Sequence, residues 1–294
     1  MLIEHRIPTR YLFQKCGRSL VAVFLIASAI TALEHSLPHT APVIPLAIPT
    51  FLGTAISLLL SFKLAQSYDR WWEARKIWGA IVNDSRTLTR QLLTFAPSES
   101  ACVRRMGRRQ IAWCYCLGQS LRSQDWRKHV IEHLSDKDVA EAEKHANKPL
   151  LLLQQQARDL ATLRDHLTDY QRVALDGTLT RLTDSMGKAE RIRNTVFPRT
   201  YRVFLRFFLF QFLTSLSFAL ESVQGGWQVV ITGLISVPFI LLERTATHMQ
   251  DPFANRPTDT AVTSIARTIH INLAQLLGED DVPQPLAAAD YYLM

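Results

Sequence analysis

Residues 41–62 read APVIPLAIPTFLGTAISLLLSF, a run of 22 residues without one charged side chain. About 20 apolar residues, rising 1.5 Å each as an α-helix, cross the hydrocarbon core of a bilayer. The run is followed by Lys63, Asp69, Arg70 and the pair Trp71 and Trp72. Charged and aromatic residues after an apolar span are typical of a helix that leaves the membrane through its interface. The alternative is a buried helix of a large soluble protein.

Three further apolar segments favour the membrane interpretation. They are residues 20–33 (LVAVFLIASAITAL), 207–220 (FFLFQFLTSLSFAL) and 225–242 (GGWQVVITGLISVPFILL). Pro238 is compatible with a membrane helix because neighbouring groups can satisfy the carbonyl that proline frees. The first segment also resembles a signal peptide, since it contains Ala27-Ser28-Ala29. That tripeptide lies inside the apolar stretch rather than after it, so we expect the segment to be retained as a span.

The distribution of Lys and Arg orients the four spans. Residues 34–40 and 221–224, which join the spans in pairs, contain neither residue, whereas Arg6, Arg10, Lys15 and Arg18 precede the first span. Short loops rich in Lys and Arg stay on the cytoplasmic side. We therefore predict a multi-pass protein with both termini and the middle of the chain in the cytoplasm.

The charge and cysteine content of the chain indicate which partners and bonds to expect. The net charge of +7 falls almost wholly on the predicted cytoplasmic side, which favours contact with the anionic lipid of the inner leaflet. No nucleic-acid motif accompanies the charge, so no nucleic-acid partner is predicted. The four cysteines are on the cytoplasmic side or at its edge, where disulfides are rare; they are Cys16, Cys102, Cys114 and Cys116. Cys114-Tyr115-Cys116 lacks zinc-site spacing and is interpreted as helix packing.

The middle of the chain reads as helices throughout. Residues 64–96 continue the second span as one helix that Pro97 ends, and Ser98 or Ser100 caps the next helix, to about residue 121. Further helices are predicted at 136–145, 150–167 and 170–195, the last capped by Thr168 and Asp169. Strand patterns are absent, so the predicted fold is all-α. The predicted divisions are a tail and two transmembrane helices (1–66, with helices at about 18–36 and 42–66), a helical cytoplasmic domain (67–200), two transmembrane helices (201–246) and a cytoplasmic C-terminal segment (247–294).

Two local patterns raise the possibility of other chemistry. Arg104, Arg105, Arg108 and Arg109 form a basic cluster, for which a solvated or lipid-facing surface is favoured over an anion site. Residues 129–133, HVIEH, match H-x-x-E-H, a pattern of zinc proteases whose two imidazoles share one helix face. The segment is strongly polar and no third ligand is identifiable, so a metal site is not predicted.

Other observations favour a passive protein. There is no G-x-x-x-x-G-K-[ST] loop for ATP and no G-x-S-x-G for a serine nucleophile. Ionisable residues are missing from the interiors of the four apolar runs, which argues against an ion-coupled carrier. We predict a protein that is not an enzyme and that needs no cofactor.

Residues 67–79, SYDRWWEARKIWG, resemble the bestrophin family in its bacterial branch, and Arg70-Trp71-Trp72 looks like the Arg-Trp-Trp of animal members. Further matches follow in order: Glu190-Arg191 with Pro198 before the third span, and Asp251-Pro252-Phe253 after the fourth. The four spans and cytoplasmic termini also match the topology of the family. Bestrophins are ion channels built as pentamers around a central pore. The resemblance therefore implies a homopentameric channel of the bacterial inner (plasma) membrane.

The resemblance also implies which residues line the pore. In the family, the second span lines an apolar neck, and alignment from Arg70 places it at Thr54, Leu58 and Phe62. Their spacing of four residues puts them on one helix face. The alternative is that Leu58 and Phe62 pack against the other spans. A second, cytoplasmic aperture falls at Tyr170 by alignment from Asp169, although this tyrosine could instead pack sideways at its helix start.

The residues after the fourth span and the charge of the neck bear on regulation and ion selectivity. Animal bestrophins follow Asn-Pro-Phe with acidic residues that bind calcium, whereas residues 254–259 here, ANRPTD, hold the single carboxylate Asp259. One carboxylate is too few for a cation that takes six to eight oxygens, so no calcium activation is predicted.

The uncharged neck selects neither sign of ion. The basic cytoplasmic half favours anions, while the bacterial resemblance favours monovalent cations such as sodium, and we predict the latter. A non-conducting membrane scaffold is a further alternative.

Overall fold

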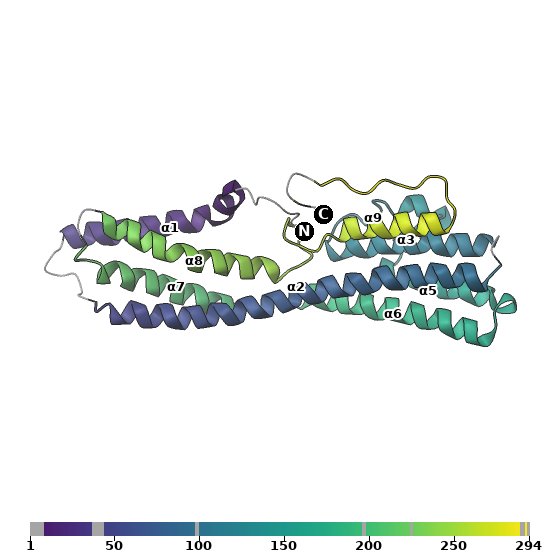
Figure 1. The fold of residues 1–294 in the computed structure, drawn as a ribbon, viewed down its shortest axis with the longest axis horizontal. Helices are drawn as coiled ribbons and strands as arrows, with labels where there is room; N and C mark the ends of the chain where they lie inside the picture. The colour runs from purple at the N-terminus through teal and green to yellow at the C-terminus, as the bar shows by residue number, and fades with distance from the viewer. Residues whose placement is uncertain are drawn as a thin grey trace. The chain divides into compact units, whose positions relative to one another are not determined.

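The computed structural model describes residues 9–36, 44–97, 100–195, 198–223, 226–288 and 292. These ranges hold helices and no β-strand, which confirms the all-α prediction (Figure 1). In chain order the helices are α1 (Thr9–Ser36), α2 (Ala47–Phe95), α3 (Ala101–Leu121), η1 (Ile131–His133), α4 (Asp136–Glu143), α5 (Lys148–Thr162), η2 (Arg164–His166), α6 (Asp169–Asn194), α7 (Arg199–Ala219), α8 (Trp227–Met249) and α9 (Val262–Leu276). Most of the predicted outer loop 34–40, and the start of the second span at 41–43, fall outside the described residues.

The described residues divide into two compact units. The first, here called the apolar unit, contains residues 9–36, 44–70, 198–223 and 226–250. The second, the polar unit, contains residues 71–97, 100–195, 251–288 and 292. Helix α2 supplies residues to both units, up to Arg70 in the first and from Trp71 in the second.

The apolar unit is formed by α1, the first part of α2, α7 and α8. All four helices are long and apolar enough to cross a membrane, in agreement with the four predicted spans. Their shared core consists of aliphatic and aromatic side chains from every helix: Val23, Ile56, Leu60, Leu205, Phe212, Leu213, Leu216 and Ile240. Gly233 of α8 permits a close approach to α1, because a Cβ there would lie only 2.9 Å from Phe24.

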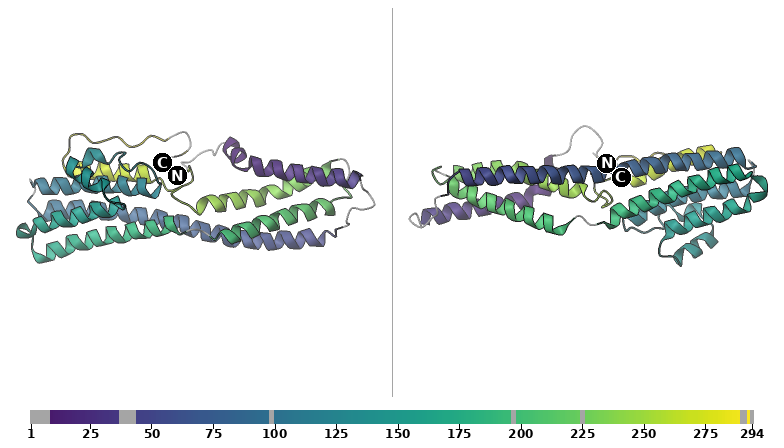
Figure 2. Two further views of the ribbon diagram at one scale, coloured as in Figure 1. Left: turned by 180° about the vertical axis from the view of Figure 1, so that it is seen from behind. Right: turned by 90° about the horizontal axis from the view of Figure 1, so that it is seen from below.

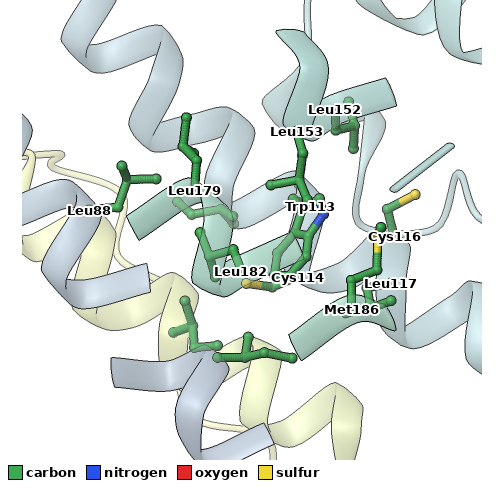
Figure 3. Close-up of a cluster of buried hydrophobic side chains, with 14 of the residues drawn as sticks. Leu88, Trp113, Cys114, Cys116, Leu117, Leu152, Leu153, Leu179, Leu182 and Met186 are labelled. Carbon is green, nitrogen blue, oxygen red and sulfur yellow. The ribbon is translucent and has the colours of Figure 1, made fainter. Parts of the chain in front are cut away.

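The polar unit packs the second part of α2 with α3, α5, α6 and α9 around a second core. Trp113 of α3 lies at its centre, among leucines of α5 and α6 (Figure 3). Cys114 and Cys116 are buried in the same core, as the packing interpretation predicted, and burial raises the pKa of both thiols to about 12. Helices α3 and α9 lie side by side in all three views (Figures 1 and 2).

Capping residues fix the starts of two helices at the positions that the sequence predicted. The Ser100 side chain accepts from the Cys102 amide at the start of α3. Thr168 and Gln171 form a reciprocal capping box at the start of α6. Helix α5 begins at Lys148, earlier than predicted, because the Asn147 side chain accepts from the Leu150 amide. Helix α9 was not predicted at all.

Candidate functional site

The residues predicted for the neck lie on an exposed face of α2. Leu58 and Phe62 are 58% and 57% exposed, and Thr54 is exposed as well. The opposite face of the same turns is buried, with Ile56 and Leu60 in the core of the apolar unit. Leu58 and Phe62 therefore do not pack into the core of this chain. An uncharged face of this kind is free to meet lipid, another subunit or a pore.

Local hydrogen bonds satisfy three hydroxyl groups on this face of α2. The hydroxyls of Thr50, Thr54 and Ser57 each donate to the backbone carbonyl four residues earlier, at 2.8, 2.9 and 2.8 Å. Such back-bonding satisfies a hydroxyl donor without water. The face can therefore carry hydroxyl groups and still be stable in a weakly hydrated environment.

An ion pair that no sequence pattern indicates lies directly beside this face. Lys63 follows Phe62, and its Nζ lies 3.0 Å from Glu243 Oε1 of α8 and donates to Thr247 Oγ1 at 2.8 Å. The Thr247 hydroxyl donates to the same Glu243 oxygen at 3.0 Å. Lys63 and Glu243 each lie one residue beyond a predicted apolar run, at 62 and 242. Nothing in the sequence pairs two residues that are 180 positions apart.

Tyr170 stands at the second position of α6, directly after the capping box of Thr168. Its side chain is 90% exposed, and Val173 one turn later is 70% exposed. Tyr170 therefore does not pack sideways against the described part of its own chain. Two apolar side chains exposed at one helix start form a surface that another molecule or subunit can cover.

The loop after α8 is tightly bonded to itself. The Arg256 amide donates to Asp259 Oδ2 at 2.9 Å, and the Thr260 amide donates to the Pro252 carbonyl at 3.1 Å. Trp71 of α2 donates its indole N–H to the Thr258 carbonyl at 3.0 Å. Asp259 is 1% exposed, and burial raises the pKa of its carboxyl to about 6.

The basic cluster of α3 is mostly paired within the polar unit. Arg105 forms a double hydrogen bond with Asp159, and Arg108 pairs with Glu279 at 2.6 Å. Arg109, only 3% exposed, pairs with Asp159 and with Asp138. The predicted solvated or lipid-facing surface is thus wrong for Arg109, because two carboxylates from α4 and α5 allow its guanidinium to be buried.

Residues 129–133 do not form the α-helix that a zinc-protease pattern requires. His129 has a left-handed backbone with φ 61°, and His133 ends the short turn η1. His133 packs edge-on against His270 with ring centroids 4.4 Å apart, and nearly parallel to Tyr115. Across the described residues, no group of three His, Cys, Asp or Glu side chains is arranged to hold a metal ion. The histidines are better described as part of the packing between α3, η1 and α9.

This histidine packing predicts a loss of stability in acid. Burial lowers the pKa of His133 to about 3, against about 6.5 for an unfolded histidine. Between those values the unfolded chain binds a proton that the folded chain does not, so stability falls as pH falls, by up to about 1.4 kcal/mol per pH unit. His133→Phe should flatten the dependence of denaturant unfolding on pH between pH 6.5 and pH 4. His145→Gln, at an exposed histidine, should keep the wild-type slope, and an equal flattening there would contradict the assignment.

The features above define an all-helical membrane protein, and comparison with known proteins gives its family. A sequence model described as "Bacterial/Fungal Bestrophin protein" matches residues 11–275. The chain belongs to this bestrophin family, as the resemblance predicted. It is 31% identical over 283 residues to the voltage-dependent anion channel-forming protein YneE of Escherichia coli K12, with 95% of this chain and 92% of that protein covered.

Other relatives and solved structures agree with this assignment. The voltage-dependent anion channel-forming protein alr2987 of Nostoc is 26% identical, over 88% of this chain and 86% of its own length. A crystal structure of a bacterial bestrophin homologue from Klebsiella pneumoniae matches with a TM-score of 0.84 at 26% identity. That match covers 89% of this chain and 98% of the other.

Proposed function

We propose that this chain is one subunit of a passive homopentameric ion channel of the bacterial inner membrane, and not an enzyme. The observation that supports the proposal is the uncharged, exposed face of α2 with Thr54, Leu58 and Phe62, in a chain that belongs to the bestrophin family. The relatives named above are described as channel-forming proteins. Four helices of membrane-spanning length supply the hydrophobic belt that such a channel needs.

In the proposed assembly, Thr54, Leu58 and Phe62 line the neck of a central pore. An apolar constriction controls conduction because water leaves it easily and an ion crossing it loses hydration. The Thr54 hydroxyl would make the outer level of the neck wider or wetter than the levels of Leu58 and Phe62. Tyr170 would form the cytoplasmic aperture, in line with the exposure of its side chain at the start of α6.

The proposed membrane topology follows the distribution of Lys and Arg along the chain. Residues 67–200 and 247–294 form the cytoplasmic part, with both termini on that side, and residues 1–66 and 201–246 provide the transmembrane helices. The net charge of +7 favours contact of the cytoplasmic side with anionic lipid. Both loops that lack Lys and Arg then face outward.

For selectivity we propose monovalent anions first. Relatives that align with most of this chain are described as anion channels, and a basic protein concentrates anions at a pore mouth. The sodium selectivity expected from the bacterial resemblance stays as the second candidate. The resemblance of residues 67–79 to the bacterial branch of the family is the observation that keeps it.

Planar-bilayer recording of the purified protein in a NaCl gradient tests the proposal. A reversal potential near the chloride equilibrium value would support the anion channel, and one near the sodium value would support the second candidate. Silence after many fusions of correctly assembled protein would contradict both and favour the scaffold alternative.

The loop after α8 leads to a separate prediction on calcium. Asp259, the single carboxylate of residues 254–259, is buried and already accepts from the Arg256 amide. Calcium requires six to eight oxygen ligands, so we expect the same current with a calcium chelator and with millimolar calcium. A calcium-dependent current that Asp259→Ala abolishes would contradict this prediction.

A further inference from the structure

The buried pair of Lys63 and Glu243 sits one residue beyond the proposed neck. The Lys63 side chain is 0% exposed, and that of Glu243 is 7% exposed. Removing two charges from water carries a large cost, which close contact and additional hydrogen bonds must offset. Thr247 provides such bonds, because its hydroxyl accepts from Lys63 and donates to Glu243. A well-completed contact of this kind holds two helices at one register.

The helical geometry of α2 links this contact to Phe62. Consecutive residues of an α-helix point about 100° apart, so Phe62 can be exposed while Lys63 is buried. Lys63 continues the buried line of Ile56 and Leu60. Any rotation of α2 that moves Phe62 therefore also moves Lys63 away from Glu243.

A second hydrogen bond holds the same turn from another helix. The Tyr201 hydroxyl of α7 donates to the Leu59 carbonyl at 2.7 Å. The turn containing Leu59, Phe62 and Lys63 is therefore bonded to α7 and to α8. Apolar packing alone is non-directional, whereas a hydrogen-bonded ion pair prefers one rotation and one height of the helix.

We propose that Lys63, Glu243 and Thr247 are positioning residues that fix the direction of Phe62 in the neck. The inference rests on the proposed function, because it requires that Phe62 line a pore. Lys63 and Glu243 need not contact the permeating ion. They act through the rotation of α2, so breaking the pair changes the fraction of time for which the neck conducts.

The test compares single, double and exchanged variants in bilayer recordings. We expect Lys63→Met and Glu243→Gln each to change the ratio of open to closed time by roughly 2- to 30-fold, the range for residues that couple to a distant equilibrium. The exchange Lys63→Glu with Glu243→Lys should bring the value back toward the wild type. The double variant Lys63→Met with Glu243→Met leaves neither member of the pair as an unpaired buried charge and should assemble even if single variants do not. It should also show the altered open probability, because the directional contact is lost.

Arg244 provides a matched control on the same helix. Its guanidinium donates to Ser19 of α1 at 2.7 Å. Arg244→Gln therefore breaks a contact between α8 and α1 and leaves the Lys63–Glu243 contact between α2 and α8 in place. We expect lower thermal stability and unchanged open probability. Wild-type open probability in the double-methionine variant, or an equal change in Arg244→Gln, would overturn the inference.

Recording Phe62→Ala in the same series distinguishes a failure of the positioning role from a failure of the proposed channel function. If Phe62→Ala changes the current while the Lys63 and Glu243 variants do not, the positioning role fails and the channel assignment stands. If the assembled wild-type protein conducts nothing, the proposed function fails, and the positioning role fails with it.

Discussion

Single-channel current is expected to rise in Leu58→Ala and Phe62→Ala. Both side chains project from the exposed face of α2, and in the proposed ring five copies narrow the pore at each level. Truncation to alanine widens the constriction and lowers the cost of keeping it wet. A barrier lower by about 1.4 kcal/mol corresponds to about a tenfold rise in conduction, which is the scale we expect for Phe62→Ala.

Equally exposed apolar residues on other helices are the matched controls. Phe207 of α7 is 58% exposed and Leu234 of α8 is 72% exposed, yet neither lies on α2. Phe207→Ala and Leu234→Ala should leave single-channel current and open probability unchanged. Unchanged currents in both α2 variants would remove the neck assignment.

The largest loss of stability is expected from Asp159→Ala. Arg109 is 3% exposed, and Asp159 is one of its two carboxylate partners. Burial opposes ionisation of Asp159, but hydrogen bonds from Arg105 and Arg109 outweigh it and hold its pKa below the usual value. Asp159→Ala leaves the buried Arg109 with Asp138 as its remaining carboxylate partner, and removing one partner of a buried charge costs about 3 kcal/mol. Denaturant unfolding of the purified protein measures this loss.

An exposed pair gives the comparison for this prediction. Arg127 and Glu143 also form an ion pair, but both side chains are about half exposed. Glu143→Ala should therefore cost less than about 1 kcal/mol. The variant with both Arg109→Met and Asp159→Asn should regain much of the loss, because it has no buried guanidinium that has lost a carboxylate partner. Equal losses in Asp159→Ala and Glu143→Ala would contradict the role of burial.

Local signals in the sequence were sufficient for much of the fold. The uncharged run at 41–62 predicted the membrane part of α2, and Ser100 and Thr168 predicted two helix starts, because composition and capping act over a few residues. Helix α9 was missed although its apolar residues follow helical spacing, with Val262, Ile269 and Leu273 buried against the core. That spacing was a usable signal.

Contacts between distant residues could not be predicted in the same way. The pairing of Lys63 with Glu243, and of Arg109 with Asp159, depends on which helices lie side by side. Residue types and local spacing do not contain that information. The sequence therefore indicated an exposed basic cluster where the structure buries Arg109. For the neck, alignment with the family supplied the residues, and the structure adds their exposure.

The back-bonded hydroxyls of α2 have a consequence for any ion that meets this face. Thr50, Thr54 and Ser57 each have one hydroxyl hydrogen, and each uses it on a carbonyl of its own helix. Only oxygen lone pairs then point outward. Lone pairs solvate a cation or the hydrogens of water, whereas a bare anion finds no donor in these three hydroxyls. An anion passing along this face gains no hydrogen bond from these three hydroxyls to replace the water that it loses, so its selectivity would be set by dehydration energy and not by binding to them.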